Sequence, residues 1–263
     1  MATGCAPAGA GGAESGSGDR PGGEVRTGGG AKADGGVESG GGVESARGLR
    51  ALAQGVRGAW PYLELIAGAN GIADPLDDRV VAAYWLGGPL LAAVGPFAAG
   101  NHVQERFAAR AGRWWTEVAA ALEDGFIANH ACHVMVVGPW VGMLRGGRSD
   151  APLEVIDRCR IRRARVLEVH CDEACVVTDR ISFSSGVLEV NSPGGGVTQR
   201  VRLGEGGRHP CGPVKVGDTV AVHWDWVCEV LTPAAGEALG RAEIAAIRRA
   251  NRALAVPGAP ELG

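Results

Sequence analysis

The chain has 263 residues, and its 44 glycines are more than twice the usual share of about 7%. The glycines have no period of three, which excludes collagen, and a hydrophobic content of 46% excludes a wholly disordered chain. Residues 1–46 hold 16 of the glycines, with six acidic residues, three basic residues and no aromatic residue. That segment therefore accounts for the whole formal net charge of −3, and residues 47–263 are formally neutral.

The neutral remainder argues against a nucleic-acid binder that uses a broad basic surface. The N-terminus has no basic region followed by an apolar run of about 7–15 residues, so we expect no export signal. The longest apolar runs are broken by Gly-Pro pairs and fall short of the roughly 18 residues that span a bilayer. Seven cysteines without an export signal favour a reducing compartment. We expect a cytoplasmic protein that binds neither nucleic acid nor membrane.

Residues 1–46 are expected to form a disordered, Gly-rich acidic tail, because Gly, Ala, Ser and acids bury too little apolar surface to offset the ordering entropy. In residues 47–147, apolar side chains recur at three- and four-residue spacing, which predicts an all-helical domain. The tryptophans there are expected to be core anchors rather than a ligand cage. The expected helical segments are Leu49–Val56, Trp60–Ala67, Val80–Trp85, 89–94, 102–122 and 129–137.

The helical period breaks at residues 146–150, and residues 152–256 are expected to form a small antiparallel β-barrel followed by a C-terminal helix. Thr232 and Pro233 fit the N-cap and first turn of that helix, and residues 257–263 are expected to be a disordered end. The predicted fold class is therefore α+β, a helical domain followed by an oligonucleotide-binding (OB)-like barrel. The expected strands are Arg165–Val169, Ala174–Thr178, Ile181–Phe183, Val187–Val190, Gln199–Leu203 and Thr219–Val222, and the helix is expected to pack through Leu239, Ile244, Ile247 and Leu254.

Cys159 is the first candidate for chemistry. It stands at the start of the expected barrel, with five arginines close by in the sequence: Arg158, Arg160, Arg162, Arg163 and Arg165. Positive neighbours stabilise a thiolate and lower the pKa of the thiol, so Cys159 is a candidate nucleophile or ligand of a soft metal. The alternative interpretation is a small buried residue in a first strand.

His223 is the second candidate, because it ends the expected strand after Gly217 and stands beside Trp224 and Trp226. A cysteine and a histidine from different strands can form a two-point metal site, with thiolate and neutral imidazole as ligands. The alternative is a structural histidine at a strand end.

His130 and His133 are three residues apart and would share one face of a helix, which makes them a second candidate metal site that His102 could join. Two further groups, His170 with Cys171 and Cys175 and His209 with Cys211, lack the spacing of a structural zinc knuckle. No nucleophile elbow or Ser-His-Asp pattern is present, so a binding protein is expected rather than an enzyme.

Two segments carry a resemblance to a known family. Cys159, followed by Arg165 and the strand Val166–Val169, resembles the N-terminus of the HypC-type hydrogenase maturation chaperones. The segment Val216–His223 resembles that family's Val-Gly-Asp strand, which ends in histidine, and the helix after Thr232 falls where the family has its C-terminal helix. The helical half also resembles an uncharacterised bacterial family, and that resemblance implies no known activity.

The HypC-type resemblance implies a small OB-like barrel that binds the iron fragment of the nickel-iron hydrogenase active site. Cys159 would be the iron-binding, partner-contacting thiol and His223 its companion ligand. The implied partners are the hydrogenase large-subunit precursor and another maturation protein. Cys159 is internal, however, and Arg163-Ala164 stand where the family has Pro-Gly. These departures favour a second hypothesis, an interaction adaptor that keeps the fold without the metal, and a third is a metalloenzyme centred on His130 and His133.

Overall fold

A computed structural model describes residues 48, 50–56, 58–111, 118–119, 125–145, 147, 150–191 and 196–256. The expected tail, 1–46, and the expected disordered end, 257–263, lie outside these residues. Contacts divide the chain into residues Met1–Ala51, of which 48, 50 and 51 are described and helical, and one compact unit from Leu52 onward. The following concerns that second unit.

Short helices make up the part before the barrel, as the apolar spacing predicted. Asp77 caps α3 by accepting a hydrogen bond from the backbone N–H of Arg79, and Asn129 caps α6 through that of Cys132. The π-helical turn η3 continues directly from α6. The elements are α2 (Trp60–Ala69), α3 (Asp78–Leu86), the 3₁₀-helix η1 (Pro89–Ala93), α4 (Pro96–Ala111), α6 (His130–Cys132), η3 (His133–Val137), α7 (Trp140–Arg145) and α8 (Asp150–Cys159).

Five strands close into a barrel in the order β1-β2-β5-β7-β6, and β3 and β4 form a separate hairpin. Inward-facing apolar side chains such as Val166, Val176 and Val220 fill the barrel. The expected antiparallel barrel needs one correction: β5 and β7 are parallel at Arg202 and Trp226. A closed barrel of five strands cannot alternate strand direction all the way round, so one neighbouring pair must be parallel. The strands are β1 (Arg162–His170), β2 (Glu173–Thr178), β3 (Arg180–Ser184), β4 (Val187–Asn191), β5 (Val197–Arg202), β6 (Thr219–His223) and β7 (Trp226–Val230).

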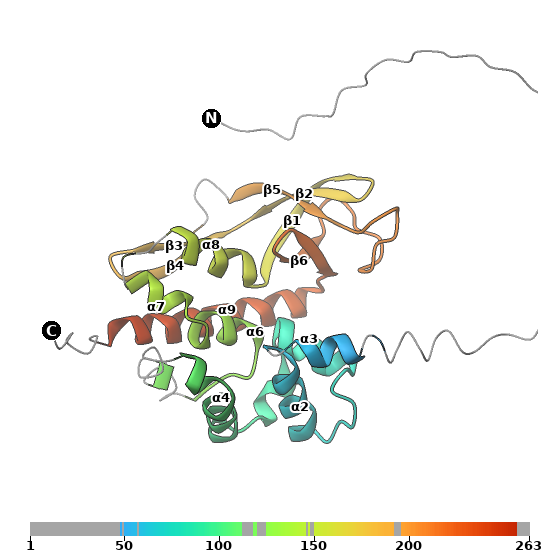
Figure 1. The fold of residues 1–263 in the computed structure, drawn as a ribbon. Coiled ribbons are helices and arrows are strands. Elements are labelled where there is room, and N and C mark those ends of the chain that lie inside the picture. Colours follow the sequence, from blue (N-terminus) through green and yellow to red (C-terminus); the bar gives the residue numbers. More distant parts are fainter. Residues whose placement is uncertain are drawn as a thin grey trace, which may run out of the picture. The chain divides into compact units, whose positions relative to one another are not determined.

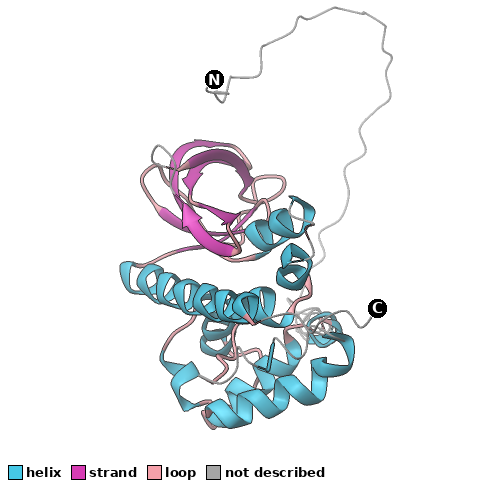
Figure 2. Cartoon of the chain, turned by 90° about the vertical axis from the view of Figure 1, so that its left-hand side faces the viewer, coloured by secondary structure: helices cyan, strands magenta, loops and turns pink. Residues whose placement is uncertain are grey.

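The C-terminal helix α9 (Pro233–Ala255) runs between the barrel and the helices α2, α3 and α4, as Figures 1 and 2 show from two directions. Thr232 caps it by accepting a hydrogen bond from Ala235 N, as predicted. Ala246 and Ala250 are fully buried in the helical core, while a Cβ at Gly240 would lie 3.2 Å from Arg163 of β1. Small side chains therefore let α9 pack closely on both layers.

A buried ion-pair network joins α8, α9 and the loop before β3. Arg160 donates to Asp157 at 3.1 Å, to the carbonyl of Asp179 at 2.8 Å and to Glu243 of α9. Asp157 also accepts a hydrogen bond from the backbone N–H of Ile181. The guanidinium and carboxylates are nearly removed from solvent, so each charge depends on its partners.

Several expectations about single segments were wrong. The sequence was expected to turn to strands after residue 150, but Asp150–Cys159 is a helix, and strand β7 was not predicted. Ile244 is 57% exposed although its spacing suggested packing, and Leu52 and Val56 are also exposed. The expected helix over 102–122 corresponds to α4 up to Ala111, and most of its remainder lies outside the described residues.

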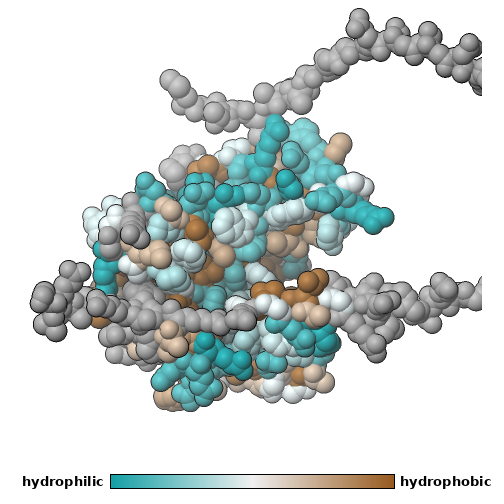
Figure 3. Space-filling model, in the orientation of Figure 1, coloured by the Kyte–Doolittle hydropathy of each residue, from teal (hydrophilic) through white to brown (hydrophobic). Residues whose placement is uncertain are grey.

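The face drawn in Figure 3 mixes hydrophilic and hydrophobic side chains, and its hydrophobic ones form small separate groups. Scattered apolar side chains of this kind are normal on a protein surface. Within the described ranges, no helix has both the length and the apolar character needed to cross a membrane.

Candidate metal centre

Three ligand-bearing side chains from three elements meet where the helical layer approaches the barrel. His130 begins α6, Cys159 ends α8 and His223 ends β6. One ligand atom from each residue lies within 4.8 Å of the other two. His130 is buried, and Cys159 and His223 are half-buried. This His-Cys-His group can hold a metal ion.

The separations suit a single ion. Cys159 Sγ lies 3.7 Å from His223 Nε2 and 3.9 Å from His130 Nε2. In a tetrahedral site with metal–nitrogen bonds of about 2.0–2.1 Å and a metal–sulfur bond of about 2.3 Å, sulfur and nitrogen ligands are about 3.6 Å apart. Small side-chain rotations would therefore bring the thiol and either imidazole to coordination distance.

Hydrogen bonds between the end of α8 and the β6–β7 turn hold Cys159 beside His223. The backbone N–H of Trp224 donates to the carbonyl of Arg158 at 2.7 Å. The Arg158 side chain pairs with Asp225 in the same turn and lies over the Trp224 ring. Arg162 donates to the Trp224 carbonyl from inside the barrel. Trp224 has a positive φ of 54°, an uncommon conformation that these contacts maintain.

Both imidazoles are in the neutral form that a metal requires. Burial lowers the pKa of His130 to about 3. Burial, followed by the positive charge of Arg162, also lowers the pKa of His223. Neutral imidazoles at pH 7 offer nitrogen lone pairs without first losing a proton from a charged ring.

The sequence predicted a lowered pKa for the Cys159 thiol, and this prediction was wrong. Burial raises its pKa, and a hydrogen bond from the Trp224 side chain only partly offsets the effect. The nearby arginines do not stabilise the thiolate because they are engaged elsewhere: Arg158 with Glu154 and Asp225, and Arg160 with Asp157 and Glu243. Cys159 is also the last residue of α8 rather than part of the first strand. The thiol is protonated at neutral pH and would have to lose its proton to bind a metal.

Aromatic side chains of α3 support the two histidines. The Trp85 ring centroid lies 4.4 Å from that of His130 and 5.4 Å from that of His223. Tyr84 Oη donates to the carbonyl of Gly58 at 2.9 Å and lies 3.4 Å from His130 Nδ1. Residues next to a ligand in this way fix its ring orientation and tautomer. Trp85 thus has a place at the site as well as in the core.

A cavity of about 630 Å³ adjoins the cluster, and His223 and Trp85 belong to its wall. Apolar side chains line much of it, including Val81, Leu86 and Ile161. Asp78, Cys228 and Glu229 add acidic and thiol groups. The His223 side of the cluster is therefore accessible from the cavity, while the His130 side is packed in the core.

His130 and His133 face different neighbours. His133 Nδ1 lies 3.1 Å from Tyr62 Oη, and the His133 ring packs against Phe107. Three helical residues turn by about 300°, so the two side chains diverge by about 60°. Only His130 belongs to the cluster with Cys159. His102 is also outside it. Its ring lies tilted against that of Tyr62, 5.7 Å between centroids, and its buried Nε2 has no hydrogen-bond partner among the described residues.

The other cysteine and histidine groups are dispersed. His170 is exposed and pairs with Glu168, while Cys171 lies exposed in the turn after β1. His209 lies 3.3 Å from Asp172. Cys175 is buried in β2, and Cys211 is half-buried with its sulfur near the carbonyl of Gly212. Within the described part of the chain, none of them belongs to a three-ligand group.

Comparison with known proteins gives one family match. The family DUF6390, a family of unknown function, matches residues 29–257. The chain belongs to DUF6390. The match spans both the helical layer and the barrel, so the His-Cys-His group of this DUF6390 chain lies within the matched region. No family match supports the HypC-type resemblance. No curated protein matches the chain, and no solved structure does either.

Proposed function

We propose that this DUF6390 chain is a metal-binding accessory protein that holds one transition-metal ion through His130, Cys159 and His223. The observation that carries the proposal is the meeting of three ligand atoms within 4.8 Å. They come from positions 29 and 64 residues apart along the chain. The three side chains are therefore brought together by the tertiary fold and not by a local sequence motif.

The donor set limits the metal. One thiolate and two imidazoles suit iron, zinc, nickel or copper, whereas magnesium and calcium take oxygen ligands. Three protein ligands leave a coordination position for another group, unlike the closed four-ligand sites that serve structure alone. The cavity beside His223 supports exchange of the ion or of a ligand on it. Iron is our preferred candidate because of the sequence resemblance.

The narrower proposal is an accessory, metallochaperone-like role in nickel-iron hydrogenase maturation. The resemblance pairs Cys159 with His223, and these side chains lie 3.7 Å apart at the edge of a closed barrel followed by a helix. Under this proposal the ion or iron fragment would pass to a hydrogenase large-subunit precursor or another maturation protein. The internal Cys159 would act without the free amino group that adjoins the family's N-terminal cysteine.

Anaerobic iron loading tests the metal site. Wild type should bind one ion per chain, and Cys159→Ser, His223→Ala and His130→Ala should each lower the affinity at least tenfold. Cys171→Ser is the matched control, because Cys171 lies beyond the far end of β1, roughly 26 Å from its start at about 3.3 Å per residue. Equal iron content in wild type and Cys159→Ser would refute the site. Iron binding that needs His130 but not Cys159 would favour the metalloenzyme centred on His130 and His133.

A second candidate is the adaptor without metal. It is favoured by His130 Nε2, which donates to the Cys159 carbonyl at 2.8 Å and is therefore satisfied without a metal. A pull-down with the hydrogenase precursor separates the two proposals. Recovery that is equal for wild type, Cys159→Ser and His223→Ala would favour the adaptor. Recovery that requires both residues and added iron would favour delivery of the metal.

A further inference from the structure

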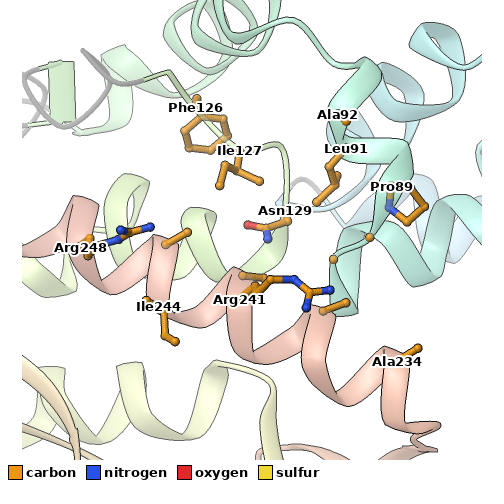
Figure 4. A pocket seen from close by; sticks show the side chains of 15 residues that line it. Pro89, Leu91, Ala92, Phe126, Ile127, Asn129, Ala234, Arg241, Ile244 and Arg248 are labelled. Carbon is orange, nitrogen blue, oxygen red and sulfur yellow. The ribbon is translucent and has the colours of Figure 1, made fainter.

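A second pocket lies on the side of α9 that faces η1 and the segment before α6, and nothing in the metal centre uses it. Its volume is about 830 Å³, within the range of small-molecule sites. The floor is formed by small residues of α9, among them Ala238, Ala242 and Ala245. Figure 4 shows Phe126, Ile127 and Leu91 across from this helix. The pocket is hollow because alanines stand where larger side chains would fill it.

The described residues of the lining carry one sign of charge. Arg241 and Arg248 are among them, and no aspartate or glutamate of the described chain is. The two arginines are seven residues apart on α9, so they share a face about 10 Å apart along the helix axis. Figure 4 shows both side chains at the pocket, with Asn129 between the walls. A ligand here meets two positive charges above an apolar floor.

Both arginines are available to a ligand. Arg248 has no hydrogen bond or ion pair within the described residues. Arg241 pairs with Glu237 at 3.5 Å, but both side chains are about 70% exposed, and such a pair contributes little. Guanidinium groups bind carboxylates through paired hydrogen bonds.

We infer that this pocket binds an aliphatic carboxylate, whose chain lies on the alanine floor and whose head group is held by Arg241 or Arg248. The apolar walls fit the aliphatic chain, and the two guanidinium groups fit the anionic head because the described lining holds no acidic side chain. An aliphatic cation would meet repulsion, and an uncharged alcohol of the same length would lose the charge-assisted hydrogen bonds. The site is separate from His130, Cys159 and His223, none of which lines it.

Calorimetric titration of the full chain with dodecanoate, below its micelle concentration, tests the inference. The double substitution Arg241→Gln with Arg248→Gln should weaken dodecanoate binding about tenfold to hundredfold, because it removes charge-assisted hydrogen bonds. It should leave the weaker binding of dodecanol within twofold. Ala245→Leu should weaken both ligands by filling the hollow.

Two controls keep the result specific. Arg252→Gln removes a positive charge from α9 outside the pocket lining and should not change the affinity. Cys159→Ser should also bind dodecanoate normally, so failure of the metal proposal would leave this one intact. Absence of dodecanoate binding to wild type, dodecanol binding as tight as dodecanoate binding, or an equal loss in Arg252→Gln would each overturn the inference. Thermal unfolding of every variant checks that it is folded.

Discussion

Replacing Tyr84 with phenylalanine should weaken metal binding without removing a ligand. In the metal-free protein, His130 Nε2 donates to the Cys159 carbonyl, so Nδ1 carries no proton. Coordination through Nε2 requires the other tautomer, with a proton on Nδ1. Tyr84 Oη lies 3.4 Å from Nδ1 and already donates to the Gly58 carbonyl, so its oxygen can accept that new N–H. Tyr84 thus stabilises the tautomer that binds metal.

The size of the effect follows from this contact. Residues that orient a metal-binding histidine change metal affinity by about 10- to 100-fold when substituted. Loss of the hydroxyl also leaves the Gly58 carbonyl without its donor, which costs about 1–3 kcal/mol of folding free energy. Tyr84→Phe should therefore lower both the metal affinity and the free energy of unfolding. The two quantities are measured separately, by chelator competition and by urea denaturation.

Tyr62→Phe is the matched control. Tyr62 is equally buried, stacks on Tyr84 at 5.6 Å and has its hydroxyl 3.1 Å from His133, which is outside the cluster. It should lose a similar folding free energy but keep the metal affinity of wild type. Unchanged affinity in Tyr84→Phe, or an equal loss of affinity in Tyr62→Phe, would refute the tautomer argument.

Three further results are expected. Metal affinity should rise about tenfold per pH unit from pH 6 to 8, because binding releases the Cys159 proton; a flat chelator-competition profile would contradict this. Without metal, the free energy of unfolding should fall by about 1.4 kcal/mol per pH unit for each of His130 and His133 as pH drops from 6.5 toward their folded pKa values of about 3 and 4. Urea titrations should show a slope smaller by about 1.4 kcal/mol per pH unit in His133→Gln than in wild type. Arg160→Met should cost about 3–5 kcal/mol in urea denaturation, against less than about 1 for the more exposed Arg158→Met, and equal losses would contradict the role of the buried network.

The order of helical and barrel segments could be predicted because each rests on local spacing. The strands around Ala174–Thr178 and Thr219–Val222 and the cap at Thr232 were predicted for that reason. Helix α8 also carried a local signal, since Asp150 and Pro152 fit a first turn and Leu153 and Ile156 share a face. This helical signal was missed because the segment after Cys159 is rich in residues typical of strands.

The candidate site could be predicted only in part. Cys159 and His223 were selected by their sequence surroundings, and they do approach each other. No local pattern joins His130 to them, because that contact depends on how α6, α8 and β6 pack. The i,i+3 spacing to His133 even suggested a different pair. Side-chain direction in a one-turn helix is decided by its tertiary neighbours, here Trp85 for His130 and Phe107 for His133.

The placement of the ligands on separate layers has a consequence for stability. His130 belongs to the helical layer and His223 to the barrel, with Cys159 between them at the end of α8. A metal bound to all three would hold the layers together, and it would bind only when they are packed. Binding to the folded state alone adds about 2.7 kcal/mol at a free metal concentration 100 times the Kd. The increase in unfolding free energy on adding metal therefore measures the site directly, without knowledge of a partner protein. It should disappear in Cys159→Ser and persist in Cys171→Ser.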